Sequence, residues 1–423
     1  MMKKIRKVKI HKFTKRKKSS NYFIMFPKIL KLFFVVLLLS IYFINNKKGK
    51  EITINYDYNF NYTNNYTNNY NYNYTDNYNY INNYTNNYNY INNYNYTNNY
   101  NYINNFNQNK KIIHLSFNMD NNYIYACIVY LTSILHNRAN STFYIIHILT
   151  NNNLSKESKK KIDNIIERFG NNSVNLSYYN LEGYFKNATI RHLPVATYYK
   201  IVLPSLLPNV DKIIFTDVDI IDLEDLSEMY SIEFKENMYF CGIADYIDHL
   251  NQLREFGLSS DKYINSGVLL MNLKAMRENS IEKMIKDFIA THVLKFHDQT
   301  AINCVCYNNT QALPYKYNFF AFPSFKDLVE LNNQQDIKYR ANESELNETF
   351  NKPTLFHYVS LDKPWLKRTT KFNRVYWWYY VKMSGFYEEI LDFYQFDKSD
   401  IDALLKQIPE DGGLLRRNYK KLD

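Results

Sequence analysis

Hydrophobic and polar positions alternate in blocks after residue 110, and these blocks predict a repeated order of strand and helix. Short apolar runs rich in β-branched and aromatic residues are typical of buried strands, and apolar residues at helical spacing are typical of packed helices. The predicted strands cover residues 112–117, 143–149 and 174–179, and the predicted helices cover 123–135, 156–169 and 196–207. This alternation predicts an α/β fold with a mostly parallel sheet and helices on both of its faces.

The next apolar run, residues 213–215, ends abruptly in carboxylates. Asp217 and Asp219 are separated by Val218, so at the strand period of two both carboxylates point to one side while the valine turns into the core. Two such carboxylates suit a hard divalent cation, which prefers oxygen ligands and keeps other positions open for phosphate oxygens. A solvated turn that binds no metal is the competing interpretation.

Beyond residue 230 the pattern is less regular. It predicts a strand at 238–244, a loop entering a buried strand at 263–273, and helices at 280–290 and 299–304. A polar insertion is expected near 332–351, and a further motif occupies 353–365. Residues 371–423 are interpreted as a helical C-terminal tail, which from residue 377 is aromatic and then charged, and which is expected to be peripheral.

The first 50 residues hold 15 of the 52 basic residues and no acidic residue. We predict a basic tail at 1–21, followed by a spanning helix at 22–44 in which Lys28 and Lys31 extend to the membrane interface. Positive charge on the N-terminal side predicts that this side is cytosolic. Because no small-x-small cleavage site follows, an uncleaved signal anchor is favoured over a removed signal peptide.

Residues 45–109 are predicted to form a disordered stem, since from residue 55 they are almost entirely Asn and Tyr. Such a stretch has too few aliphatic side chains to build a packed core. Its Asn-Tyr-Thr triplets fit the N-glycosylation acceptor at Asn61, Asn65, Asn73, Asn83 and Asn95. A β-aggregating tract is the alternative.

The net charge of +11 is concentrated at the N-terminus, because after residue 50 there are 37 basic residues against 41 acidic ones. The remaining balance of −4 argues against a nucleic-acid-binding face. Four cysteines in 423 residues are too few for a disulfide scaffold, although a single bridge stays open as a possibility in an oxidising lumen.

Several motifs, taken in order, resemble those of the retaining glycosyltransferases of family eight, which share the GT-A fold. The motifs lie at residues 118–123, 196–204, 215–219, 264–274, 297–299 and 357–365, and the resemblance covers roughly 111–370. It implies a catalytic domain at 110–370. It also implies that Asp217, Asp219 and His357 bind Mn²⁺, with Mg²⁺ as the alternative, and that Lys363 stabilises the departing diphosphate.

The same resemblance implies the residues around the donor. Residues implied to contact nucleotide or phosphate are Asp120, Asn122, Tyr123, Lys200, Asp217, Val218 and Ser360; those implied near the sugar are Asp245, Asn265, Ser266, Asp298 and Gln299. The family commonly has Arg at the position of Lys200 and Gly at that of Ser360. A turn or helix cap is the alternative role for Asn122, an Asx-turn for Asn265 and a helix N-cap for Asp298. His297 is expected at the surface.

The implied reaction transfers a hexose or pentose from a UDP-sugar to a glycan or glycoconjugate, with the anomeric configuration retained. Candidates for a covalent nucleophile are Asp245, Asp298 and Gln299; because an amide is a poor nucleophile, we favour a front-face route. The anchor predicts a type II protein of the Golgi or another secretory membrane, with its catalytic domain in the lumen. The alternatives are a catalytically silent family member and a surface protein in which the Asn/Tyr tract is the working part.

Overall fold

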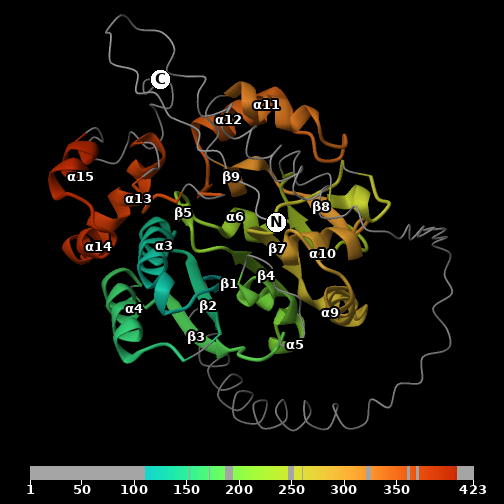
Figure 1. Ribbon diagram of the computed structural model, residues 1–423, viewed down its shortest axis with the longest axis horizontal. Helices are drawn as coiled ribbons and strands as arrows, with labels where there is room; N and C mark the ends of the chain where they lie inside the picture. Colours follow the sequence, from blue (N-terminus) through green and yellow to red (C-terminus); the bar gives the residue numbers. More distant parts are fainter. Residues whose placement is uncertain are drawn as a thin grey trace, which may run out of the picture. The chain divides into compact units, whose positions relative to one another are not determined.

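Figure 1 shows the computed structural model, which describes residues 110–406 except for 152, 171, 186–193, 246–251, 260, 321–324, 360–362 and 368–370, and only the backbone of 371–373. The predicted basic tail, spanning helix and stem lie outside the described residues, as does the end of the predicted C-terminal tail. In the part of the chain that is described, no helix is long and apolar enough to cross a membrane.

Among the described residues, ten strands form two sheets. They are β1 (Lys111–Asn118), β2 (Thr142–Thr150), β3 (Val174–Asn180), β4 (Lys212–Thr216), β5 (Ile220–Asp222), β6 (Phe240–Gly242), β7 (Val268–Asn272), β8 (Thr310–Ala312), β9 (Phe319–Phe320) and β10 (Leu355–His357). The larger sheet has the order β3-β2-β1-β4-β7-β6-β8. Its pairings are parallel except those that β7 makes with β4 and β6, so the mostly parallel sheet is confirmed.

The helices connect and cover these strands. The α-helices are α3 (Ile124–Asn137), α4 (Lys156–Phe169), α5 (Leu203–Leu206), α6 (Ser227–Ser231), α8 (Leu273–Glu278), α9 (Ile281–Thr291), α10 (His297–Val305), α11 (Phe325–Asn333), α12 (Glu343–Asn351), α13 (Lys371–Ser384), α14 (Tyr387–Tyr394) and α15 (Lys398–Leu405). The 3-10 helices are η1 (Asn121–Tyr123), η2 (Val195–Val202) and η3 (Tyr315–Asn318).

The first three predicted strands and first two predicted helices are confirmed to within two residues at each end. The helix expected at 196–207 is mostly 3-10, and α12 lies within the expected polar insertion.

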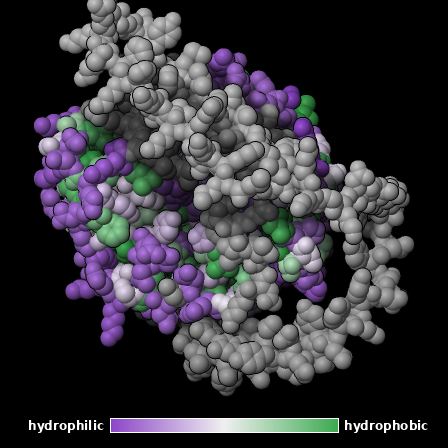
Figure 2. Space-filling model, viewed as in Figure 1, coloured by the Kyte–Doolittle hydropathy of each residue, from purple (hydrophilic) through white to green (hydrophobic). Residues whose placement is uncertain are grey.

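The large sheet separates two hydrophobic cores, because successive strand residues face opposite sides. Ile214 joins the core shared with α3 and α4, while its neighbours Ile213 and Phe215 join the core shared with η2, α8, α9 and α10. Figure 1 shows α3 and α4 on one side of the strands and α5, α9 and α10 on the other. Helices on both faces of the sheet are therefore confirmed. On the face drawn in Figure 2, hydrophilic residues dominate the described surface and hydrophobic residues are scattered among them.

The smaller sheet has the order β5-β10-β9. β10 runs antiparallel to β5, and His357 lies opposite Ile220. β9 lies on the other side of β10, with Phe320 opposite His357. This sheet brings His357, near the end of the predicted catalytic domain, beside the turn of residues 217–219 that follows β4.

The C-terminal helices are part of the fold, and the interpretation of this stretch as peripheral is wrong. Trp377 and Trp378 on α13 are fully buried, and α13 packs against α3. Trp377 also contacts Trp365, with 5.6 Å between ring centroids. The aromatic residues of the tail thus extend the core on the α3 side.

All four cysteines lie among the described residues, and none of them forms a disulfide. Burial raises the pKa of each thiol, so these cysteines behave as small hydrophobic side chains.

A pair of buried histidines predicts a loss of stability in mild acid. His114 Nδ1 lies 3.0 Å from His147 Nε2, and burial lowers the pKa of His114 from 6.5 to about 4. Between pH 6.5 and pH 4 the unfolded chain takes up a proton that the folded chain does not, so stability is full above pH 6.5 and falls with the pH. We expect this group alone to remove about 2 kcal/mol between pH 7.5 and pH 5.

Urea unfolding at the two pH values tests this, with His114→Asn as the comparison, because asparagine keeps hydrogen-bonding capacity but does not titrate. The variant should lose about 2 kcal/mol less than the wild type over the same interval. Equal losses in both proteins would contradict the assignment.

Candidate active site

The acidic turn joins the two sheets. Asp217 follows β4 directly, Asp219 precedes β5, and the backbone N–H of Asp217 donates to the carbonyl oxygen of Gly267 at 2.7 Å. Val218 is 8% exposed and packs in the core, as the period of two predicts. The turn therefore leaves both carboxylates on one side.

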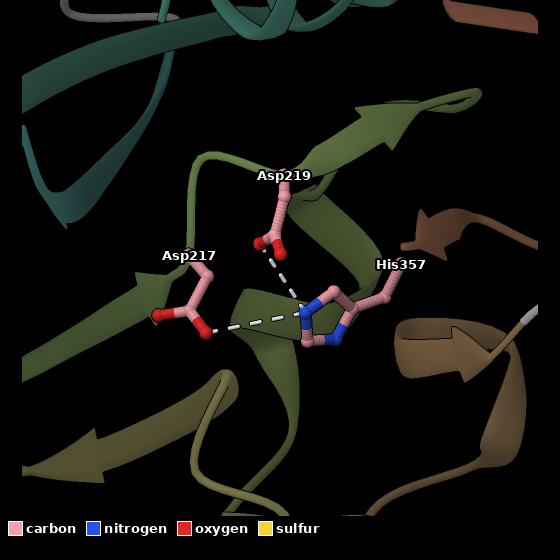
Figure 3. Close-up of side chains that lie close together, drawn as sticks. All are labelled: Asp217, Asp219 and His357. Atoms are coloured by element: carbon pink, nitrogen blue, oxygen red, sulfur yellow. Dashed lines mark ion pairs between the residues drawn. The ribbon is translucent and has the colours of Figure 1, made fainter. Parts of the chain in front are cut away.

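His357, the last residue of β10, completes this cluster. Its Nε2 lies 3.4 Å from Asp219 Oδ1 and 3.9 Å from Asp217 Oδ2, and all three candidate ligand atoms lie within 4.8 Å of one another. Figure 3 shows the imidazole ring with Nε2 directed at the two carboxylates. The three residues that the resemblance assigned to a metal are thus brought together, although His357 follows Asp219 by 138 residues.

The electrostatics of the cluster favour a cation. The Asp217 side chain is 41% exposed, but neighbouring protein atoms displace part of its hydration and raise the pKa of its carboxyl, against the opposing charge of Lys200. Burial has the same effect at Asp219, but there the ammonium of Lys363 and the ring of His357 outweigh it and lower the pKa. Two carboxylates and one imidazole are a donor set that fits Mn²⁺, and also Mg²⁺ less well because of the nitrogen ligand.

Gly267 provides the space in which the ligand side chains meet. A Cβ at this position would lie 2.4 Å from His357 Cε1 and 2.8 Å from Asp217 Oδ2, closer than real Cβ atoms approach. Only glycine leaves both ligands where they are. The backbone of 265–267 therefore shapes the cluster as much as the ligands themselves do.

Lys363 lies against the cluster from the chain that follows β10. Its ammonium pairs with the Asp219 carboxylate and donates to the carbonyl oxygen of Tyr358 at 2.7 Å. The position suits its predicted contact with a diphosphate. Ser360, predicted to contact the phosphate, lies outside the described residues, and its role remains a prediction.

The residues predicted around the donor sugar form one buried hydrogen-bonded network together with Lys200. Its members are Lys200, Asp245, Asn265, Ser266, Asp298 and Gln299, each no more than 8% exposed. Gln299 Nε2 donates to Asp245 Oδ2 at 2.6 Å, and Asn265 Nδ2 donates to the same oxygen at 3.2 Å. Gln299 Oε1 in turn accepts from the backbone N–H of Ser266 at 3.0 Å.

Lys200 anchors the other end of this network. Its Nζ lies 2.8 Å from Asp298 Oδ2 and donates to the carbonyl oxygen of Ser266 at 2.8 Å. It also lies 4.3 Å from the centre of the Phe215 ring. Ser266 Oγ donates to the same Asp298 oxygen at 2.8 Å. Lys200 thus neutralises a buried carboxylate, which is a role that its resemblance to a donor-contacting arginine did not predict.

Two alternatives for single residues are decided by this geometry. Asn265 does form an Asx-turn, since its Oδ1 accepts from the N–H of Gly267 at 2.9 Å, and it bonds to the network as well. Asp298 is not a helix N-cap: α10 is capped at Phe296, with no side-chain hydrogen bond.

The expectation that His297 lies at the surface is wrong. The residue is fully buried at the start of α10, and its ring contacts Tyr198 with 5.7 Å between centroids. Its φ of 41° places it in the left-handed region, where a non-glycine residue is uncommon. This bend directs the next two residues, Asp298 and Gln299, into the network.

The first βα loop lies near the cluster. Asp120 Oδ1 accepts from the backbone N–H of Asn122 at 2.8 Å and of Tyr123 at 3.2 Å, so Asp120 itself is the cap and Asn122 is not. Tyr123 is 44% exposed and meets Trp365 edge to face, with ring centroids 6.5 Å apart. Burial and then the charge of Asp219 raise the pKa of Tyr123. An exposed ring beside the acidic turn is a surface on which a base can stack.

One residue of this site was not predicted from the sequence. Asn318, at the end of η3, is fully buried and lies 2.7 Å from His357 Nδ1 through its Oδ1. Its Nδ2 donates to Asn265 Oδ1 at 2.9 Å. Its only sequence signal is a polar residue within an aromatic run, which is too common to single it out.

Comparisons with known proteins found relatives in sequence and in fold. The sequence model of glycosyl transferase family 8 matches residues 114–369. General stress protein A of Bacillus subtilis is 22% identical over 268 residues, covering 61% of this chain and 89% of that protein. The lipopolysaccharide 1,2-glucosyltransferase of Escherichia coli is 24% identical over 265 residues, covering 60% of this chain and 74% of that protein.

A similar fold is found in the crystal structure of the galactosyltransferase LgtC in complex with donor and acceptor sugar analogues. The TM-score is 0.52 at 18% identity, and the match covers 64% of this chain and 95% of that one. At this identity the likeness shows a common fold.

Proposed function

Because the chain belongs to glycosyl transferase family 8, we propose that it transfers a hexose or pentose from a UDP-sugar to a hydroxyl group of a glycan or glycoconjugate. That it is a glycosyltransferase follows from the family. The donor, the divalent cation and the stereochemistry of transfer are the proposal. The observation that carries it is the meeting of Asp217, Asp219 and His357 within 4.8 Å, beside an ammonium group and a buried polar network.

In this proposal the three ligands hold Mn²⁺, or Mg²⁺, next to the diphosphate of the donor. The cation supplies charge that offsets the negative charge growing on UDP as the glycosidic bond stretches. Lys363 adds a second positive charge at the same place. Asp120, Asn122 and Tyr123 are proposed to hold the uracil and ribose.

The sugar is proposed to lie against Asp245, Asn265, Asp298 and Gln299. Hydrogen bonds from two amides already engage Asp245 Oδ2, and the Asp298 carboxylate is paired with Lys200. Lone pairs held in this way are poor nucleophiles. We therefore propose retention by the front-face route, in which these residues bind and orient the sugar without a covalent intermediate.

The cellular location is a proposal as well. The basic segment 1–21 and the apolar segment 22–44 support a single-pass type II anchor in the Golgi or another secretory membrane. The catalytic domain is then lumenal.

The test is release of UDP by the purified chain from UDP-glucose, UDP-galactose and UDP-xylose, each with Mn²⁺, with Mg²⁺ and with EDTA. We expect turnover of one donor that requires the cation. Asp219→Asn should lower that turnover at least about 100-fold, because it removes a charged ligand of a Lewis acid worth several kcal/mol.

Asp163→Asn is the matched control, because Asp163 is exposed on α4 and should keep wild-type turnover. Equal turnover of Asp219→Asn and wild type would reject the metal assignment. A wild-type chain that turns over none of the three donors would favour a silent, sugar-binding family member.

A further inference from the structure

A line of hydrogen bonds connects the sugar network to the metal cluster, and it runs through Asn318. His357 Nδ1 lies 2.7 Å from Asn318 Oδ1, and Asn318 Nδ2 lies 2.9 Å from Asn265 Oδ1. Asn265 Nδ2 then donates to Asp245 Oδ2. No sequence motif marks Asn318, whose two side-chain partners are 39 and 53 residues away in the chain.

Asn318 is held rigidly for this contact. It is fully buried at the end of η3, directly before β9, and β9 pairs in parallel with the strand that carries His357. The carbonyl oxygen of Lys316 in the same turn accepts from the backbone N–H of Thr354, just before β10, at 2.8 Å. The amide therefore has a fixed place beside the imidazole ring.

The direction of each hydrogen bond in the line can be assigned by starting at Asn265, the end that is distant from His357. A backbone N–H can only donate, so the Gly267 N–H at 2.9 Å identifies the oxygen of the Asn265 amide. That oxygen has a second lone pair, which can accept only from a donor, so the group of Asn318 that faces it is the NH₂. The Asp245 carboxylate, an acceptor when ionised, meets the NH₂ of Asn265 and requires the same orientation.

The orientation of Asn318 in turn fixes the proton of the histidine. Its remaining oxygen faces His357 Nδ1, which must then carry the hydrogen. In the neutral ring this leaves the lone pair on Nε2, the atom that points at Asp217 and Asp219. A lone pair directed at these two carboxylates is what a cation bound between them requires.

We propose that Asn318 is a positioning residue that holds His357 as the Nδ1–H tautomer, with Nε2 ready to bind a divalent cation, and that it ties this choice to the donor-sugar residues. The inference rests on the metal site of the proposed function. It adds a residue outside the ligand set and a physical link between cation binding and the sugar network.

The experiment measures binding of Mn²⁺ alone to the purified chain by isothermal titration calorimetry, with no UDP-sugar present. Asn318→Ala is expected to weaken binding about 10- to 100-fold, as loss of an orienting partner of a metal-binding histidine typically does. Asn318→Asp keeps an oxygen acceptor for Nδ1 and should bind at least as tightly as wild type, while its donor turnover falls because Asn265 loses a hydrogen-bond donor.

Asn332→Ala is the matched control. Asn332 is also a buried asparagine, and its amide exchanges two hydrogen bonds with the backbone of Ala341. It should lower thermal stability without changing the affinity for Mn²⁺. A double variant, Asn265→Ala with Asn318→Ala, should bind Mn²⁺ no more weakly than Asn318→Ala alone, since one break already interrupts the line.

Each remaining outcome overturns the inference. Wild-type affinity in Asn318→Ala, equal weakening in Asn318→Ala and Asn332→Ala, or Asn318→Asp binding as weakly as Asn318→Ala would each show that the asparagine does not orient the histidine. A wild-type chain that binds no Mn²⁺ would instead reject the metal site itself, and this separates failure of the proposed function from failure of the positioning role.

Discussion

Gly267→Ala is expected to lower donor turnover about 1000-fold, more than the loss of one charged ligand. The added methyl group would lie 2.4 Å from His357 Cε1 and 2.8 Å from Asp217 Oδ2, so it displaces two of the three ligands at once. A misplacement of about 1 Å can cost 100-fold, and loss of the cation adds several kcal/mol of lost charge stabilisation. Release of UDP measures the first effect, and calorimetric titration with Mn²⁺ measures the second.

Gly257→Ala controls for the general cost of replacing a glycine. Gly257 has a φ of +72°, and an added Cβ there would meet nothing within 4 Å. It should lower the free energy of unfolding by about 1 kcal/mol or slightly more, through backbone strain alone. Its Mn²⁺ affinity should equal that of wild type. Normal Mn²⁺ binding by Gly267→Ala would show that the cation does not sit between these ligands.

The sequence predicted the regular half of the fold because its first three strands are long, with eight, nine and seven residues. The first three strands and the helices after the first two of them carry clear hydrophobic periods, and their bounds were found closely. β5, β9 and β10 have only two or three residues each, too few to show any period. The sheet that brings His357 to the acidic turn was therefore not predicted, and only the resemblance implied that His357 meets Asp217 and Asp219.

The residues of the candidate site also differ in how well the sequence predicted them. The spacing of Asp217 and Asp219 is enough to predict how they lie, because a strand period of two places both carboxylates on the same side. No local pattern predicts the role of Asn318, since this role depends on His357 and Asn265, which only folding brings to it. His297 was expected at the surface, but it is fully buried, with a left-handed backbone and its ring against Tyr198.

The tail shows that aromatic composition alone does not locate a segment. Trp377 and Trp378 are neighbours in sequence and point in different directions around a helix, yet both are fully buried. This requires cover around much of the helix: α13 packs against α3, α14 and α15, and both tryptophan rings contact aromatic residues of α14. Such burial depends on tertiary packing that no local period reveals.

Lys200→Met is expected to destabilise the fold by about 3–5 kcal/mol, because it leaves the Asp298 carboxylate buried without its cation. The two charged atoms lie 2.8 Å apart, and their side chains are 3% and 5% exposed. Unlike a surface ion pair, this pair is shielded from bulk solvent, which could otherwise hydrate the remaining charge. Urea unfolding at pH 7.5 measures the loss, which should appear as a lower midpoint with an unchanged slope.

Lys200→Met combined with Asp298→Asn separates the burial of charge from the loss of packing. With no charge left to bury, the double variant should recover most of the stability that Lys200→Met loses. Donor turnover should stay low in both proteins, because Asp298 also accepts from Ser266 and lies in the proposed sugar site. A double variant as unstable as Lys200→Met would mean that the lysine contributes through packing on Phe215 rather than by neutralising the aspartate.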